Sequence, residues 1–231
     1  MKKIAGFVFC LLGVAALTLL GILSAVESVG TDAKLYHELQ MREGALAQAG
    51  ISEIDLIRLD NALAKCLKGD EAALESLGMV EIFGQYREPF NEKERQHMED
   101  CRELFNLLRI TKWTSLAVGT LALTGGIVLL KRRKPVRWAA ILGPMALLIP
   151  LGAFGCWAAT DFNGAFDSFH RVLFTNELWL LDPRTDLLIR ICPSGMFAQM
   201  GLRIGLMGLM WMLLIPVLVM LVSLGIKERK E

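Results

Sequence analysis

Two histidines that lie far apart in the sequence, His97 and His170, are the residues best suited to acid–base chemistry. An imidazole has an ordinary pKa of about 6.5, so it can accept or donate a proton at neutral pH. An aspartate lies three residues from each histidine, at Asp100 and at Asp167. On a helix such a neighbour can approach the ring and fix its tautomer. These four residues form the candidate site, although a histidine on an apolar helix face is more often structural.

The stretch from Asp161 to Phe197 surrounds His170 with aromatic and charged residues. It lies between two apolar segments, and a titratable patch beside an apolar surface is a common setting for a binding site. We take its aromatic side chains and one arginine as candidate pocket residues, namely Phe166, Phe169, Phe174, Trp179 and Arg190. Packing in the core is the alternative role for the aromatic residues.

A helix is expected to position His97. Asn91 and Glu94 have the spacing of a capping box, in which two side chains satisfy backbone N–H groups at a helix start. The helix should continue through His97 and Leu108. An unbroken upright helix would lift His97 roughly 24 Å above Trp113, because each residue adds 1.5 Å. We therefore expect a bend near Ile110–Trp113, or a strong tilt, and a separation of the two imidazoles within about 8 Å.

Four apolar stretches are long enough to cross a bilayer as helices. The chain is 54% hydrophobic, and prolines at 144 and 150 lie inside the third stretch. For the first stretch we prefer a retained helix to a cleaved signal peptide, because its apolar run is long and Leu23-Ser24-Ala25 is a poor cleavage site. The predicted segments are 1–26, 113–130, 138–158 and 201–231, the last including a basic tail.

The distribution of positive charge predicts the orientation of these helices. Basic residues gather at the N-terminus, in a loop over 131–137 and in the tail, and the positive-inside rule places all three on the cytoplasmic side. The segments 27–112 and 159–200 should then face outward and form one cap. The formal net charge of +1 gives no indication of nucleic-acid binding.

Within the first cap segment, local signals predict short elements. Ser52 resembles an N-cap followed by acids in the first helical turn. A second helix is expected over 71–77, and a small strand over 79–86, which Pro89 would end.

The two histidine stretches together resemble the lipoprotein intramolecular transacylase (Lit) family of Gram-positive bacteria. The matching residues are Glu94-Arg95-Gln96-His97-Met98-Glu99-Asp100, Asp167-Ser168-Phe169-His170, Phe174, Trp179, Leu181-Asp182, Asp186-Leu187-Leu188-Ile189, Pro193 and Phe197. The resemblance covers nearly the whole chain. One departure is Cys101, at a position where the family pattern has an apolar β-branched residue.

This resemblance implies a mainly α-helical membrane protein with four transmembrane helices under an extracellular cap. It implies transfer of the sn-2 acyl chain of a diacylglyceryl lipoprotein to the α-amino group of its own N-terminal cysteine, which gives the lyso-form. The catalytic residues would be His97 and His170, facing outward from the plasma membrane. The partners would be the lipoprotein substrate and membrane lipid, with no cofactor, nucleotide or nucleic acid. Which histidine acts as the base stays open.

Two other functions compete with this one. A zinc enzyme could use His97 and Cys101, spaced one helical turn apart, with His170 and Cys192 completing the site. However, no HExxH motif is present, and the cysteines, Cys66 among them, form no paired motif, so we expect no metal. A non-catalytic membrane scaffold is the third hypothesis, and it predicts that loss of both histidines has no effect.

Overall fold

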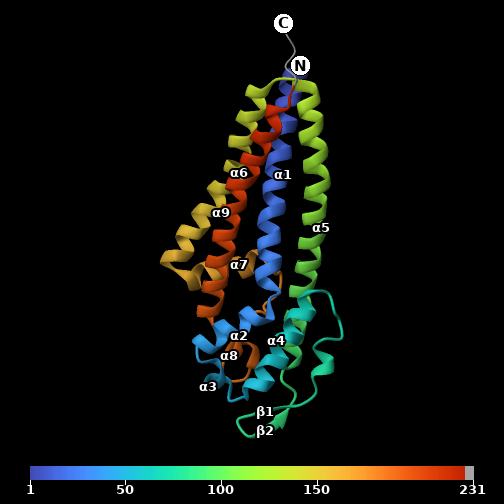
Figure 1. Ribbon diagram of the computed structural model, residues 1–231. Helices are drawn as coiled ribbons and strands as arrows, with labels where there is room; N and C mark the ends of the chain where they lie inside the picture. The colour runs from blue at the N-terminus through green and yellow to red at the C-terminus, as the bar shows by residue number, and fades with distance from the viewer. Residues whose placement is uncertain (227–231) are drawn as a thin grey trace. The chain divides into compact units, whose positions relative to one another are not determined.

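The computed structural model describes residues 1–226, and its regular structure is nearly all helical (Figure 1). The chain divides into two compact units, each assembled from segments that are distant in sequence. The bundle unit consists of Met1–Val26, Leu108–Ala159 and the chain from Ile204 on. The site unit consists of Glu27–Leu107 and Thr160–Arg203, so it contains both candidate histidines.

Four helices in the described part of the chain are long and apolar enough to cross a membrane. They overlap the four apolar stretches of the sequence, which confirms the prediction of a mainly helical membrane protein with four such helices. The predicted basic tail falls largely on residues 227–231, outside the described residues. The helices are α1 (Lys2–Gly30), α5 (Glu92–Leu130), α6 (Arg133–Thr160) and α9 (Ser194–Leu224).

Helix α1 is the central helix of the bundle unit, and glycines bring its neighbours close (Figure 1). A Cβ on Gly13 would lie 2.6 Å from the backbone nitrogen of Leu123 on α5. A Cβ on Gly21 would lie 2.5 Å from the Trp211 ring on α9, and one on Gly143 of α6 would lie 2.8 Å from a valine of α1. The helices therefore approach at positions where a side chain would not fit, as is common between membrane helices.

Two features predicted from the sequence, the basic loop over 131–137 and a bend near 110–113, differ from the structure. The basic loop over 131–137 is shorter than expected, because α6 begins at Arg133 and Pro135 fits its first turn, where a missing N–H costs no hydrogen bond. Helix α5 is α-helical throughout, without interruption at 110–113, where the sequence has no glycine or proline to break it. The alternative that we expected, a strong tilt, stays a prediction.

The site unit contains short helices around one apolar core. Ser52 caps α4 as predicted, because its Oγ accepts a hydrogen bond from the backbone N–H of Asp55 at 3.1 Å. Helix α4 buries Leu56 and Leu59 in this core. The other helices of the unit are α2 (Ala33–Arg42), α3 (Ala45–Ala49), α7 (Phe162–Leu173) and α8 (Leu187–Ile191), with α4 at Glu53–Leu67.

The segment before α5 is less helical than the sequence suggests. The helix expected over 71–77 is reduced to a 3-10 turn, Glu75–Leu77. The expected strand over 79–86 folds into a hairpin of β1 (Val80–Ile82) and β2 (Gln85–Arg87). Its two-residue turn has positive φ at both positions, 49° at Phe83 and 79° at Gly84. Such a turn matches the twist of the strands. Glycine adopts positive φ without steric strain, so one of the two turn positions costs little free energy.

The core of the site unit also contains a carboxyl group without a partner. Asp60 on α4 is 1% exposed, and neither of its carboxylate oxygens has a hydrogen-bond partner among the described residues. The Nδ1 atom of His37 on α2 lies 3.8 Å from it. Burial raises the pKa of Asp60 from 3.8 to about 7, because the charged form loses its hydration.

Stability should therefore fall as pH rises through this region. The folded protein holds the Asp60 proton up to about pH 7, whereas the unfolded chain releases it at about pH 4, so this contribution is present at low pH and is lost as pH rises. The loss between pH 5 and pH 8 should be about 2–3 kcal/mol. Thermal unfolding of the purified protein at both pH values would measure it. Asp60→Asn, which has no proton to lose, isolates the effect: an equal pH dependence in both proteins would contradict the assignment.

Candidate active site

Helix α7 presents His170 to the interior of the site unit. Asp161 caps the helix start by accepting a hydrogen bond from the backbone N–H of Gly164 at 2.9 Å. His170 and Phe166 lie one turn apart, and the Nδ1 atom of His170 lies 2.8 Å from the carbonyl oxygen of Phe166. Since a carbonyl oxygen can only accept, this contact places the ring proton on Nδ1 and leaves the Nε2 lone pair available.

The first turns of α5 present His97. The predicted capping box is present: the Asn91 side chain accepts from the Glu94 N–H at 3.0 Å, and the Glu94 carboxylate accepts from the Asn91 N–H at 2.8 Å. His97 follows within the next turn and is 7% exposed. Its Nε2 atom lies 3.7 Å from the Cys101 sulfur, and its Nδ1 atom is buried without a hydrogen-bond partner among residues 1–226.

These two helices bring the imidazoles together. The ring centroids of His97 and His170 are 6.1 Å apart, within the separation of about 8 Å expected for residues that share a site. Phe174 contacts both rings, with centroid distances of 5.2 Å to His97 and 5.7 Å to His170. Three further aromatic rings lie around His170, namely Phe166 at 4.2 Å, Trp179 at 5.1 Å and Phe169 at 5.5 Å.

Burial keeps both imidazoles neutral at physiological pH. His97 lies in the charged first half of α5, before the apolar stretch that begins at Trp113. Burial, reinforced by the neighbouring imidazole of His170, lowers the pKa of His97 to about 4, and Asp100 opposes this shift. Burial also lowers the pKa of His170, against the opposing effects of the Phe166 carbonyl and Asp167. The site can therefore supply neutral imidazole as both an acceptor and a donor of hydrogen bonds.

Comparison with known protein families shows the family of this chain. A model of the family "Lipoprotein intramolecular transacylase Lit" matches residues 11–197, well over half of the chain and inclusive of both histidines. The chain belongs to the Lit family. It is therefore an enzyme of a transacylase family, as the resemblance of its two histidine stretches implies.

Solved structures of the membrane-integral lipoprotein intramolecular transacylase Lit from Bacillus cereus have a similar fold. One is 21% identical to this chain over 92% of this chain and 93% of its own, with a TM-score of 0.67. Two variants, with a histidine replaced by arginine or by alanine, are 20% identical, cover 93% of this chain and 90% and 91% of theirs, and have TM-scores of 0.65. No curated protein matches the chain. The structural likeness supports the Lit fold.

The supporting residues that we predicted for this Lit-family site have other contacts. Asp100 accepts a hydrogen bond from the side chain of Asn176 at 2.9 Å and makes none with His97 in the described structure. Asp167 is exposed. Arg190 lies over the Phe83 ring at 5.8 Å, and its Nε donates to the carbonyl oxygen of Asp186. None of these three contacts is with an imidazole, whereas the four predicted aromatic residues all surround His170.

Sequence reasoning missed a second role of Glu94. Its carboxylate is 1% exposed and accepts the backbone N–H of Leu188, at the start of α8, at 2.6 Å. Beside it, Asn91 donates to the Asp186 carboxylate at 2.9 Å. Burial raises the pKa of Glu94, while its backbone hydrogen bonds oppose the shift. These contacts join the first turn of α5 to the stretch that follows Trp179, and the only sequence signal was the local capping box.

The structure brings together only part of the zinc site that we considered. His97 and Cys101 are adjacent, but the Cys192 sulfur lies 3.9 Å from the Gln40 side-chain nitrogen, in the core. Residues 1–226 contain no group of three or more histidine, cysteine, aspartate or glutamate side chains arranged to hold a metal ion. All five cysteines are free thiols, and burial raises the pKa of Cys101 and of Cys192 to about 12. The two adjacent donors, His97 and Cys101, are fewer than the three or four protein ligands that hold zinc, so the described residues do not form the zinc site that we considered.

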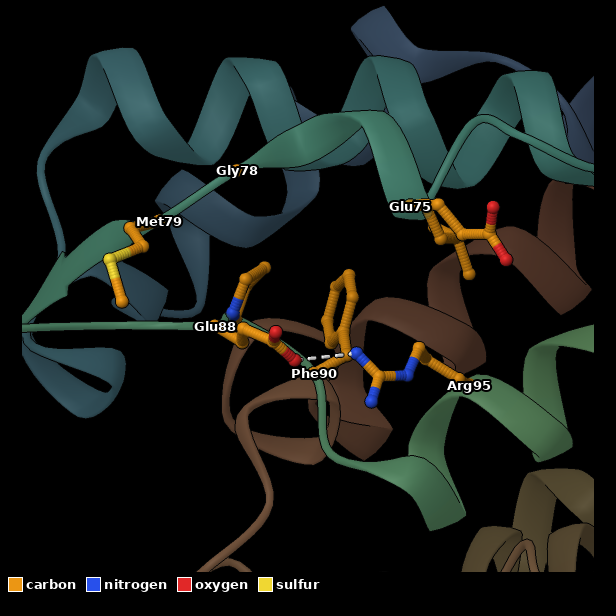
Figure 2. Close-up of a pocket in the computed structure, with 8 residues that line it drawn as sticks. Glu75, Gly78, Met79, Glu88, Phe90 and Arg95 are labelled. Atoms are coloured by element: carbon orange, nitrogen blue, oxygen red, sulfur yellow. Dashed lines mark hydrogen bonds and ion pairs between the residues drawn. The ribbon is translucent and has the colours of Figure 1, made fainter.

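A pocket of the site unit is lined by none of the predicted catalytic, supporting or pocket residues. Figure 2 shows this pocket of about 150 Å³ beside the hairpin, with the Arg95–Glu88 ion pair of 2.7 Å across it. Phe90 and Met79 form part of its apolar lining. Neither imidazole lines it, so it is separate from the candidate active site.

Proposed function

We propose that this protein moves the sn-2 acyl chain of a diacylglyceryl lipoprotein to the α-amino group of the same lipoprotein's N-terminal cysteine. The observation that carries this proposal is the pair of neutral, buried imidazoles of His97 and His170, 6.1 Å apart among aromatic rings. Membership of the Lit family supports the transfer of an acyl group on a lipoprotein. The aromatic rings offer an apolar surface for an acyl chain.

His170 acts as the base in this proposal. Its Nδ1–H donates to the Phe166 carbonyl, which fixes the ring orientation and exposes the lone pair of Nε2. Its lowered pKa keeps this lone pair free of a proton at neutral pH. A base in this state can remove the proton that the attacking amine must lose.

His97 acts as the hydrogen-bond donor. The raised pKa of Cys101 keeps its thiol protonated, so the thiol can donate to Nε2 of His97 and leave the ring proton on Nδ1. That Nδ1 atom is buried without a partner among the described residues, which makes it available to a substrate oxygen. A donor aimed at the oxygen of a tetrahedral intermediate stabilises the charge that develops there.

The bonds and protons of the reaction balance without a cofactor. The amine nitrogen attacks the ester carbonyl carbon as His170 takes one of its protons. The tetrahedral intermediate collapses, the bond between the carbonyl carbon and the glyceryl oxygen breaks, and that oxygen receives the proton from the imidazolium of His170. The products are an amide on the cysteine nitrogen and a free sn-2 hydroxyl. Since both reacting groups belong to one molecule, holding them in contact supplies much of the rate.

The proposed orientation places this chemistry outside the cell. The basic residues at Lys2-Lys3 and over 131–137 support a cytoplasmic location for the end of the bundle unit at which α1 begins and α5 ends. The site unit then serves as the extracellular cap, where exported lipoproteins are anchored.

Fragmentation mass spectrometry of lipoprotein N-termini tests this function. Cells that lack the protein would be compared with cells that express it or the His97→Gln/His170→Gln double variant. Because the transfer is intramolecular, the mass of the lipidated cysteine should not change. Instead, one acyl chain should stay with the cysteine nitrogen when the thioglyceryl group is lost, and only in cells with the unmodified protein.

Other outcomes would identify the competing functions. A hydrolase would lower the mass of the lipidated cysteine by one acyl chain. A scaffold would produce the same fragments from cells with the double variant as from cells with the unmodified protein. Either result would overturn the proposed function.

A further inference from the structure

A short strap, defined here as Phe174–Leu181, covers His170. Phe174 stacks on the imidazole at 5.7 Å with an interplanar angle of 25°, and Trp179 stacks on it at 5.1 Å with an angle of 27°. Trp179 is only 9% exposed although most of its neighbours in the strap are exposed. The strap therefore sets how deeply His170 is buried.

Asn176 makes two hydrogen bonds within this strap. Its side-chain oxygen accepts the backbone N–H of Leu178 at 3.1 Å, which closes a turn. Its backbone carbonyl accepts the indole N–H of Trp179 at 3.0 Å. An indole that is fixed at its only polar atom has little freedom to leave the imidazole on which it stacks.

The same residue ties the strap to α5. The Asn176 side-chain nitrogen donates to the Asp100 carboxylate at 2.9 Å, one turn beyond His97. A second tie joins the Lys93 ammonium to the carbonyl oxygen of Leu180. Asn176 is exposed, so burial in the core does not explain its three hydrogen bonds.

We propose that Asn176 is a positioning residue of the acyl-transfer site. It holds Trp179 over His170 and couples the strap to the α5 turn that carries His97. Asp100 holds Asn176 and makes no hydrogen bond with the His97 ring in the described structure. This inference rests on the proposed function for its effect on rate, but its effect on the burial of His170 does not depend on that function.

Exchanging the side chains of Asn176 and Asp100 tests the hydrogen bond between them. Asn176→Asp places two carboxylates 2.9 Å apart, so the strap should detach and the transfer rate should fall roughly 10–100-fold. Asp100→Asn keeps an amide oxygen that can still accept from Asn176, so the strap should stay attached in this variant. The double variant Asn176→Asp/Asp100→Asn restores the hydrogen bond with its polarity reversed, and it should recover most of the lost rate.

A second measurement reports whether the strap covers His170, and it does not depend on the transfer rate. Diethyl pyrocarbonate modifies accessible imidazoles, and peptide mass spectrometry reports the modification of each histidine separately. His170 should react slowly with diethyl pyrocarbonate in the protein without substitutions and in the double variant. It should react at least several-fold faster in Asn176→Asp. This pattern is expected even if the protein moves no acyl group.

Three results would overturn the inference. Asn176→Asp could leave both the modification of His170 and the rate unchanged, so that the tie positions nothing. The double variant could be as impaired as Asn176→Asp, so that the hydrogen bond is not what matters. Asp100→Asn could lose activity without exposing His170, which would return Asp100 to a direct role on His97.

Discussion

Replacing His170 by alanine should lower the rate of acyl transfer by about 10²–10⁴-fold, the usual contribution of a general base. The imidazole is oriented by the Phe166 carbonyl, and burial lowers its pKa, so it is held as the neutral base that the step requires. His97→Ala should cause a loss of the same order, because the buried Nδ1 donor disappears. Rates would be measured with a synthetic diacylglyceryl peptide and purified protein in detergent.

His37→Ala is the matched control for these variants. It removes an imidazole from the same unit, but His37 pairs with Glu53 at 3.3 Å, and its ring is in none of the aromatic contacts around His170. We expect a nearly unchanged rate from it. A normal rate in either His97→Ala or His170→Ala, in folded protein, would end the two-histidine mechanism.

Glu94→Ala should destabilise the protein by about 3 kcal/mol and also reduce activity. The substitution removes the acceptor of the buried Leu188 N–H and breaks the capping box with Asn91. A buried donor without a partner costs about 1–3 kcal/mol, and a lost cap adds about 1 kcal/mol. Thermal unfolding in detergent would measure the loss, and trypsin digestion would show whether cleavage after Arg190, on α8, becomes faster.

Glu92→Ala provides the comparison for Glu94. Glu92 is in the same first turn of α5, but it is exposed and makes only surface contacts with Arg95 and Gln96. Surface pairs of this kind contribute at most about 1 kcal/mol. If both variants lose the same stability, the contact between Glu94 and Leu188 does not hold the two segments together.

The sequence predicted the four long apolar helices and the start of α5 well because both depend on local patterns. Uninterrupted apolar stretches mark the four long helices, and Asn91 with Glu94 marks the start of α5. The aromatic residues around His170 were found because Phe166, Phe169 and Phe174 are its near neighbours on the chain.

What the sequence did not predict depends on contacts between distant segments. Asp100 is one turn from His97, and local spacing alone favoured a direct contact, yet the partner of Asp100 is 76 residues away. The second partner of Glu94 is 94 residues away. The hairpin was predicted as one strand because Phe83 is an unusual residue in a tight turn.

The glycine contacts around α1 have a consequence for handling the protein. Of the four apolar helices, α1 is the most enclosed. In its apolar stretch 39% of the residues are buried, against 22–28% in the other three helices. Detergent competes for lipid-facing side chains, but it cannot enter where the backbones of α1 and α5 already touch. On extraction, detergent should first replace lipid on the exposed faces of α5, α6 and α9, while the glycine contacts that enclose α1 stay closed. Harsh solubilisation should therefore loosen this bundle from its outer helices inward.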